Sequence, residues 1–283
     1  MNRHKFNLKE IDQLKEMAQK CRKDVLNMVM SSGEGHLGAA FSSMEILTTL
    51  YFSILNIDPS QPHRKDRDRF IMSKGHGCFA YYAVLARRGF FPVDLLDTVK
   101  QKDTIFGGHP DRDKVPGIDV STGSLGHGLS IGAGMALADK RDGKSARVFV
   151  LMGDGECQEG SVWEAAMFAS AHNLDNLIAI VDANSLQAIG RTDDIVGIEP
   201  LSEKWRAFGW EVCEADGHDC SELSDKLSHI PIKPGLPTAV IARTVKGKGV
   251  SYMENEIMWH ARPVTEEEFR QAMCELDRSI ETK

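Results

Sequence analysis

The stretch ARVFVLMGDGECQEG, residues 146–160, decides the fold, because an apolar run in it leads directly into a tight glycine-rich turn. An apolar run such as 146–152 is typical of a parallel strand that is buried on both faces. The Gly-Asp-Gly turn lets the backbone approach a ligand closely, and a helix is expected after it, at 161–172. The next apolar run, LIAIVD at 177–182, predicts a second strand beside the first.

Outward from this unit, strands and helices alternate along most of the chain. The expected elements are the strands 69–73, 146–152, 177–182, 210–215 and 238–243 and the helices 8–30, 42–55, 129–141, 161–172, 202–208, 220–230 and 264–280. This alternation predicts an α/β fold with a mostly parallel, doubly wound sheet and helices on both faces. No linker, low-complexity tract or internal repeat interrupts it, so we expect residues 1–283 to form a single domain.

Composition and charge exclude several classes of protein. Of the 283 residues, 42% are apolar and 27% are charged, and the net charge of −7 provides no positive field to recruit nucleic acid or an anionic membrane. The start of the chain, at 1–20, lacks the apolar core of a signal peptide, and no apolar run is long enough to span a bilayer. The six cysteines are scattered without a C-x-x-C pair, which is typical of reduced thiols. We therefore expect a cytoplasmic protein that binds neither nucleic acid nor membranes.

The turn after the strand 146–152 has the ligands of a metal site. Asp154 provides a carboxylate at the carboxyl end of that strand, and Asn184 follows the neighbouring strand in the sequence DANS. Ligands of open α/β sheets collect at the carboxyl ends of strands. Asp154, the side-chain oxygen of Asn184 and the backbone carbonyl of Leu186 would give three oxygens, which two diphosphate oxygens and a water would complete to the octahedron that Mg²⁺ prefers.

Histidines in glycine-rich surroundings form a second group of candidate site residues. They are His36 in GEGHLG, His76 in SKGHG, His109 in GGHP, His127 in LGHG and, beside an aromatic residue, His260 in MWHA. Imidazole can donate hydrogen bonds or move protons, while flanking glycines let the backbone lie against a ligand. The remaining histidines have no such setting and are interpreted as surface or structural residues: His4, His63, His172, His218 and His229.

Other phosphate-site and hydrolase motifs do not match the chain. KGKG at 246–249 lacks the spacing and the closing Ser or Thr of a nucleotide-binding P-loop. GSLGHG at 123–128 matches a dinucleotide fingerprint only loosely, because no apolar strand directly precedes it. GDGECQEG lacks the alternating acidic ligands of a calcium loop, and no G-x-S-x-G is present for a serine hydrolase.

Taken together, the motifs resemble the amino-terminal, diphosphate-binding part of transketolase. The resemblance extends over nearly the whole chain and rests on GEGHLG, SKGHG, GGHP, STGSLGHGLSIGAGMALA, GDGECQEGSVWEA, DANS and WHA, which occur in the family's order and spacing. It implies a thiamine-diphosphate-binding fold, with thiamine diphosphate and Mg²⁺ (or Ca²⁺ or Mn²⁺) as cofactors.

The resemblance also implies roles for individual residues. The metal ligands would be Asp154, Asn184 and the Leu186 carbonyl, and the cofactor would be bound by Gly153, Asp154, Gly155, Asn184, His76, Gly123 and Leu125. Three histidines would act near the sugar's reacting carbon: His36, His109 and His260. Glu159 would lie across the subunit interface from the cofactor-activating glutamate. One departure is His127, where better-known members usually carry Gln.

The implied activity is transfer of a two-carbon glycolaldehyde unit from a ketose phosphate to an aldose phosphate, as in the pentose phosphate pathway. Transketolases continue with a pyrimidine-binding domain and a carboxyl-terminal domain, whereas this sequence stops at Lys283. We therefore expect a split enzyme, in which a carboxyl-terminal transketolase subunit supplies the activating glutamate and most residues for the sugar phosphate. The expected assembly is an α2β2 heterotetramer, and the chain is expected to be active only with its partner.

Three alternatives stay open at this point. The first is a split enzyme of the same build that acts on another sugar phosphate, outside the pentose phosphate pathway. The second is a subunit similar to deoxyxylulose-phosphate synthase or to the decarboxylating subunits of 2-oxo acid dehydrogenases, which share the GDG…N element but match the histidine contexts less well. The third is a non-catalytic regulatory or scaffold relic, against which the complete set of metal ligands and site histidines argues.

Overall fold

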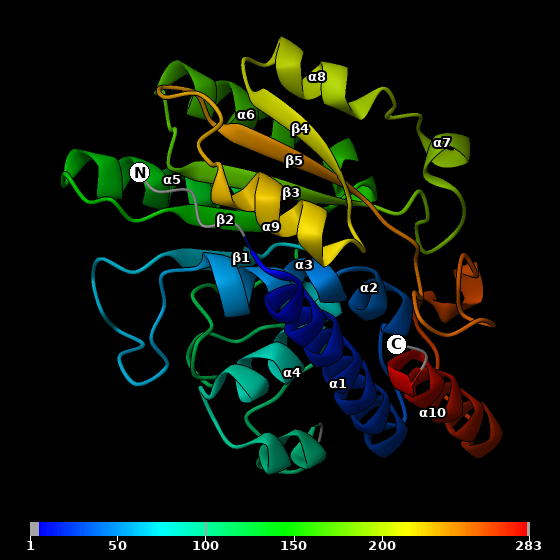
Figure 1. The fold of residues 1–283 in the computed structure, drawn as a ribbon. Helices are drawn as coiled ribbons and strands as arrows, with labels where there is room; N and C mark the ends of the chain where they lie inside the picture. The colour runs from blue at the N-terminus through cyan, green and yellow to red at the C-terminus, as the bar shows by residue number, and fades with distance from the viewer. Residues whose placement is uncertain (1–5, 100, 282–283) are drawn as a thin grey trace.

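The computed structural model describes residues 6–99 and 101–281, and among these residues five strands form one sheet in which every neighbouring pair runs parallel (Figure 1). The strands are β1 (Arg69–Met72), β2 (Val148–Gly153), β3 (Leu177–Ala183), β4 (Glu211–Asp216) and β5 (Thr238–Arg243), in the spatial order β1-β2-β3-β5-β4. Each expected strand is present, with its ends displaced by at most two residues. The prediction of a parallel α/β sheet is confirmed.

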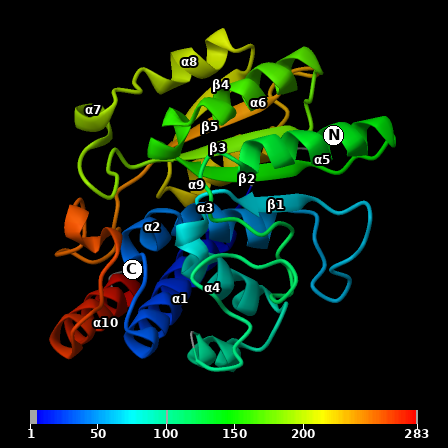
Figure 2. The same cartoon turned by 180° about the vertical axis from the view of Figure 1, so that it is seen from behind.

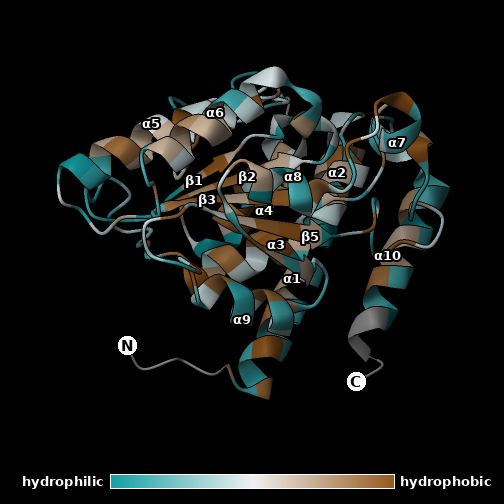
Figure 3. Ribbon diagram, turned by 90° about the horizontal axis from the view of Figure 1, so that it is seen from above, coloured by the Kyte–Doolittle hydropathy of each residue, from teal (hydrophilic) through white to brown (hydrophobic). Residues whose placement is uncertain are grey.

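The central strands read as continuous apolar runs because both of their faces are buried. In β2, Val148, Val150 and Met152 belong to one hydrophobic core, whereas Phe149 and Leu151 belong to the core on the opposite face. Successive side chains of a strand point to opposite faces, so a polar residue at any of these positions would enter one of the two cores. Figure 3 shows the strands as apolar ribbons between the helices.

Helices cover both faces of the sheet (Figures 1 and 2). One face carries α1 (Leu8–Ser32), α2 (Leu37–Ser42), α3 (Met44–Thr49), α4 (Cys78–Arg88), α9 (Cys220–Ser228) and α10 (Glu266–Glu281), and the other carries α5 (Gly128–Arg141), α6 (Gly160–Ala171) and α8 (Leu201–Ala207), with the short α7 (Thr192–Ile195) in the connection after β3. Helices on both faces confirm the doubly wound arrangement. Within the described residues, no helix is long and apolar enough to cross a membrane.

Several helical segments differ from the sequence prediction, including the short α7, which was not predicted. The helix expected at 42–55 is divided into α2, α3 and a π-helical turn (Leu50–Ile54), and the break lies at Ser43, whose hydroxyl donates to the Ala39 carbonyl at 2.9 Å. A hydroxyl that bonds back to its own helix competes with the regular backbone pattern. Helix α4 was not predicted; its residues from 78 to 86 are all buried, and it packs against α1, α2 and α3.

Helix α5 packs closely on β2 through a single glycine. A Cβ added to Gly132 would lie 2.7 Å from Cγ2 of Val150, closer than real Cβ contacts. Two residues further along the same helix, Gly134 is exposed and has open space around its Cα. Of the three glycines in GLSIGAGMALA, close packing requires Gly132, against β2, and Gly128, against Ser73, but it does not require Gly134.

We expect Gly132→Ala to destabilise the fold by about 1–3 kcal/mol, because the added methyl group overpacks the α5–β2 contact. Gly134→Ala should instead stabilise it by up to about 1 kcal/mol, because alanine loses less backbone entropy in a helix. Urea unfolding midpoints of the two variants measure both effects. Shifts in the same direction for both variants would contradict the assignment of Gly132 as the contact residue.

Candidate active site

Polar side chains meet at the carboxyl edge of the sheet, where four neighbouring strands end. Lys74 follows β1, Asp154 follows β2, Asn184 follows β3 and Lys246 follows β5, and all four residues are buried. They line one cavity of about 380 Å³. Because parallel strands end on the same side, positions that lie 172 residues apart in the sequence, Lys74 and Lys246, share this cavity.

The two turns that carry Asp154 and Asn184 hold each other in place. One carboxylate oxygen of Asp154 accepts from the Gly155 N–H at 2.8 Å, and the other accepts from the Ser185 N–H of the second turn at 2.6 Å. Ser185 has a φ of +63°, a left-handed conformation that is rare outside glycine. The side-chain oxygen of Asn184 accepts from the Leu186 N–H at 3.1 Å. The side-chain oxygens of Asp154 and Asn184 are thus fixed on one cavity wall.

Asp182, at the end of β3, joins the surrounding elements beneath the cavity. Its buried carboxylate forms an ion pair with Lys74 and accepts hydrogen bonds from the hydroxyls of Thr244 and Ser42, the latter at 2.6 Å. Burial raises the pKa of Asp182, but Lys74 and the two hydroxyls outweigh this effect and hold it below its usual value. One ionised side chain therefore connects the ends of β1, β3 and β5 to α2.

Glu156 connects the glycine-rich loops through hydrogen bonds, as Asp182 connects the strand ends. It lies in the short 3-10 turn Gly155–Gln158, is buried, and accepts hydrogen bonds from the Ser73 hydroxyl, from the Gly126 N–H at 2.9 Å and from the Gly153 N–H at 3.2 Å. It thus joins the end of β1, the loop before α5 and the GDG turn. No sequence pattern indicates this role, because Glu156 looks like any charged residue of a surface turn.

Two buried lysines add positive charge that the sequence reasoning missed. The Lys246 ammonium donates to the Leu186 carbonyl at 3.0 Å and lies 2.9 Å from Nδ1 of His260. Burial and the neighbouring charge of Lys74 lower the pKa of Lys246 to about 8. The sequence KGKG was compared only with a P-loop motif, and that comparison does not indicate that Lys246 is a buried site residue. The signal that could have identified both cations is a lysine just beyond the end of a buried strand, in SKGHG and in TVKGKG.

Three of the predicted histidines form a cluster. The ring centroids of His36, His76 and His260 lie 5.4 Å from one another in all three pairs. His76 lines the first cavity and also a second one of about 540 Å³, which His36 and His109 line as well. Burial is the main cause that lowers the pKa of each clustered histidine, and it brings that of His260 to about 4. These three rings are therefore neutral near pH 7 and can accept or donate hydrogen bonds.

Every candidate site residue except His127 lines one of the two cavities. The first is lined by His76, Gly123, Leu125, Gly153, Asp154, Gly155, Glu159, Asn184, Leu186 and His260, and the second by His36, His76 and His109. Glu159 and Leu125 are exposed at the rim. His127 lines neither cavity; it is exposed, and its ring lies 3.0 Å from the Leu125 carbonyl.

The donor set fits a divalent cation that is bound together with an anion. Burial and the charge of Asp182 raise the pKa of Asp154 to about 6, so a cation at this carboxylate would relieve an unfavourable buried charge. Among residues 6–99 and 101–281, no three His, Cys, Asp or Glu side chains converge as a metal site. A cation held here needs further oxygens, and a diphosphate facing Lys74 and Lys246 would supply them. Fold and site together define an α/β domain for a phosphate-bearing ligand.

The chain is similar to known transketolases over almost its full length. Residues 13–279 match the family model described as "Transketolase, thiamine diphosphate binding domain". A 6-deoxy-6-sulfo-D-fructose transketolase subunit from a Clostridium species is 43% identical over 94% of this chain and 96% of its own. One subunit of the apulose-4-phosphate transketolase from Actinobacillus succinogenes is 45% identical over 96% of this chain and 98% of its own.

Longer relatives match in their thiamine-binding part. Human transketolase is 36% identical over 99% of this chain, which spans 44% of that protein's length. The structure of transketolase from Leishmania mexicana superposes with a TM-score of 0.88 and 29% identity, over 95% of this chain and 42% of the other. The chain therefore belongs to the transketolase family and is a transketolase-type transferase with a thiamine-diphosphate-binding domain.

We expect the buried charge of Asp154 to make the metal-free chain less stable as the pH rises. Its folded pKa of about 6 lies above the ordinary value of 3.8, so the folded state binds more protons and loses stability between these two pH values. Asp154→Asn should therefore raise the free energy of unfolding above pH 7, by an amount on the order of 3 kcal/mol. Near pH 4 the gain should vanish.

Urea unfolding in a metal-free buffer with a chelator, at several pH values, measures this difference. Asp97→Asn, a change on the exposed 3-10 turn Val93–Thr98, is the matched control and should unfold like the unsubstituted chain at every pH. An equal effect of Asp154→Asn at pH 4 and pH 8 would contradict the assigned cause.

Proposed function

We propose that this chain is the cofactor-binding subunit of a split transketolase, which binds thiamine diphosphate with Mg²⁺ and transfers a two-carbon glycolaldehyde unit between sugar phosphates. The observation that carries the proposal is the buried oxygen pair of Asp154 and Asn184 beside two buried lysines and a cluster of three histidines. The cavity with the oxygens and lysines suits a diphosphate with its cation, and the cavity with the histidines suits a polyhydroxylated sugar.

The residues of the chain divide into two functional groups. Asp154, Asn184 and the Leu186 carbonyl would hold the cation; the carbonyl has two lone pairs and can accept from Lys246 at the same time. Gly155 has no side chain to keep the diphosphate from its backbone. The turn also has no room for one, since a Cβ there would lie 2.8 Å from Cγ of Gln187. When bound, thiamine diphosphate supplies the electron sink for cleavage of a carbon–carbon bond next to a carbonyl. Gly123 and Leu125 would line its ring region.

The histidines would handle the sugar. His36 and His260, whose pKa values are lowered, would accept hydrogen bonds from sugar hydroxyls and take a proton from a hydroxyl oxygen as the bond breaks. His109, exposed on the wall of the second cavity, would contact the same substrate from the loop before α5. His76 lines both cavities and would lie between cofactor and substrate.

We propose a single domain over residues 1–283 that acts with a partner chain, in an α2β2 assembly. The partner would carry the pyrimidine-binding and carboxyl-terminal domains and the activating glutamate, opposite Glu159. Two relatives, each named as one subunit of a transketolase, have the length of this chain, which supports the division. Exposed apolar residues on the packed pair α5 and α6, namely Ile131, Met167 and Phe168, support a covered surface on this side. The six free cysteines suit the cytoplasm.

The donor sugar is the part of the function that the relatives leave most open. The pentose phosphate pathway would need a ketose phosphate such as xylulose 5-phosphate, whereas the relatives named above act on 6-deoxy-6-sulfo-fructose and on apulose 4-phosphate. All three are ketoses with an anionic end. An assay of the chain with its partner on these three donors, with ribose 5-phosphate as acceptor, distinguishes them, and turnover of none would sink the proposed activity.

We expect Asp154→Asn to weaken Mg²⁺-dependent thiamine diphosphate binding by more than about tenfold, because loss of even an outer-shell partner of a metal has an effect of that size. Titration followed by near-ultraviolet circular dichroism, with chain and partner together, measures the affinity. Asp97→Asn is again the control. Unchanged binding by the Asp154 variant would refute the ligand assignment.

We expect His36→Asn to lower kcat by about 100-fold or more while leaving cofactor affinity within about twofold, because the ring faces the second cavity and acts on substrate protons. Steady-state kinetics with the best donor, together with the same titration, separates the two effects. An equal loss in cofactor affinity would show that His36 belongs to the cofactor cavity instead.

A further inference from the structure

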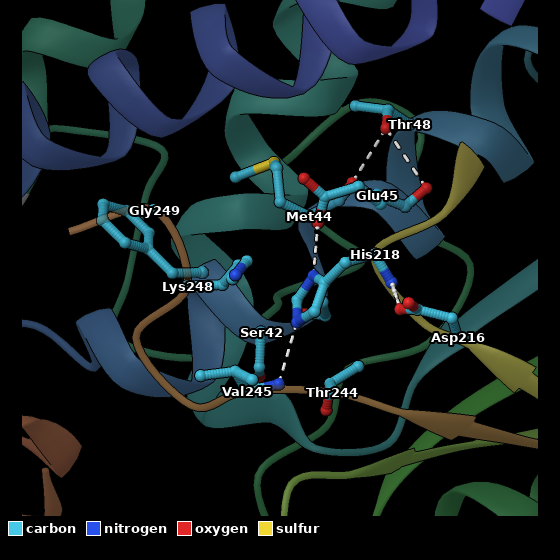
Figure 4. Close-up of polar contacts among 12 residues, drawn as sticks. Ser42, Met44, Glu45, Thr48, Asp216, His218, Thr244, Val245, Lys248 and Gly249 are labelled. Carbon is cyan, nitrogen blue, oxygen red and sulfur yellow. Dashed lines mark hydrogen bonds and ion pairs between the residues drawn. The ribbon is translucent and has the colours of Figure 1, made fainter. Parts of the chain in front are cut away.

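His218 lies outside both cavities and connects helix α3 to the segment that follows β5. It lies in the turn after β4, and its Nδ1 is 2.8 Å from a carboxylate oxygen of Glu45 on α3 (Figure 4). Its Nε2 accepts a hydrogen bond from the Val245 N–H at 2.8 Å. The side chains of His218 and Glu45 are only 12% and 10% exposed. The Asp216 carboxylate fixes the turn by accepting from the backbone N–H of His218 at 2.8 Å.

The surroundings define which ring nitrogen carries the proton. Glu45 is buried, which raises its pKa, but Arg22 and His218 outweigh burial and lower it to about 2, so Glu45 is an ionised acceptor. Arg22 holds that carboxylate with two hydrogen bonds of 2.5 and 2.7 Å. Because Glu45 accepts and Val245 donates, Nδ1 of His218 carries the proton and Nε2 is bare. A neutral imidazole is the side chain that joins a carboxylate to a backbone N–H in this way.

The segment that His218 holds ends in the site lysine. Thr244 is held by the Ala183 carbonyl at 3.2 Å and by Asp182, and Gly247 is held by the Gly38 carbonyl at 3.1 Å. Between them, the backbone N–H of Val245 has His218 as its one hydrogen-bond acceptor within the described residues. The next residue is Lys246, whose ammonium contacts the Leu186 carbonyl and His260. On the other side, the Val245 and Lys246 carbonyls accept from the N–H groups of Lys248 and Asn255 at 3.2 and 2.9 Å. His218 therefore anchors the Thr244–Val245 peptide through which the chain reaches Lys246 from β5.

We propose that His218, oriented by the Arg22–Glu45 pair, is a positioning residue that fixes the Thr244–Val245 peptide, directly before Lys246, and so holds the Lys246 ammonium at the cofactor cavity. This inference rests on the proposed function and extends it beyond the residues that line the two cavities. The contacts of His218 are those of a structural residue, one of the two interpretations given to it from the sequence, and the proposal connects that structural role to the site. His218 acts through Lys246 and touches neither cofactor nor substrate.

Two substitutions separate the two ends of the imidazole. In His218→Gln, the side-chain oxygen can reach the Nε2 position and accept from Val245. In His218→Asn, the shorter amide can donate to Glu45 but cannot reach Val245. His229→Gln is the matched control, because His229 is an exposed histidine whose Nδ1 contacts only its own helix end. Arg22 remains to pair Glu45 in each variant, so the core keeps its charge balance.

Hydrogen exchange of the cofactor-free full chain tests the anchor directly. We expect amide exchange in residues 244–250 to become about tenfold faster in His218→Asn, to stay within about twofold in His218→Gln and to be unchanged in His229→Gln, since a neutral hydrogen bond is worth up to about this factor. Unchanged exchange in the Asn variant would overturn the proposal.

Thiamine diphosphate titration with Mg²⁺ and the partner chain tests the link to Lys246. We expect His218→Asn to raise the Kd about tenfold and His218→Gln to restore most of it. In a Lys246→Met background, the Asn substitution should change the Kd by less than about twofold, because the two residues act in series. An equal factor in both backgrounds would show a merely structural role. If the unsubstituted enzyme binds no thiamine diphosphate, the proposed function fails, and the exchange measurement still decides whether His218 anchors the segment.

Discussion

The ionised carboxylate of Asp182 is the interaction on which the geometry of the site depends. The central strands are buried on both faces and are apolar along most of their length, so the polar side chains of the site lie where the strands end. Asp182 takes hydrogen bonds and charge from the ends of β1 and β5 and from α2, and thereby fixes the relative positions of turns that come from distant parts of the sequence. Asn184 and the GDG turn are built on this base, since Asp154 is held by the turn that Asp182 begins. A buried charge that depends on several partners is stable only when they are present.

The parts of the structure that the sequence predicted are those that depend on local pattern. The apolar runs before Asp154 and Asn184 identified both strands, and parallel pairing then required their ends to be neighbours. The missed parts depend on partners far along the chain. Helix α4 packs against α1, α2 and α3, and Glu156 gains its role only because Ser73 and Gly126 lie against it. Lys246 and His218 follow the same rule: each looks like a surface residue until the fold supplies Leu186 and Glu45 as partners.

With the proposed function, the two cavities would explain how one fold serves relatives with different sugars. The cavity with Asp154, Asn184 and the lysines would hold the diphosphate with its cation, and nothing in it would need to change with the substrate. The cavity with His36 and His109 is lined by loops before α2 and α5, and its outer wall includes Glu34 and Arg262. Arg262 lies over the Trp259 ring at 4.2 Å and pairs with Glu268, so the far wall is tied to α10. Loops can vary at such positions without disturbing the sheet edge.

The exposed apolar residues of α5 and α6 affect how much of the chain stays folded and unaggregated in a cell. Ile131, Met167 and Phe168 stand open on helices that pack against each other. A free surface of this kind associates with whatever apolar surface it meets, and does so more as its concentration rises. In the proposed assembly, chain made in excess of the partner that covers these residues would keep an apolar surface exposed to aggregation and proteolysis. The proposed enzyme would then depend on balanced synthesis of its two chains as well as on the chemistry of its site.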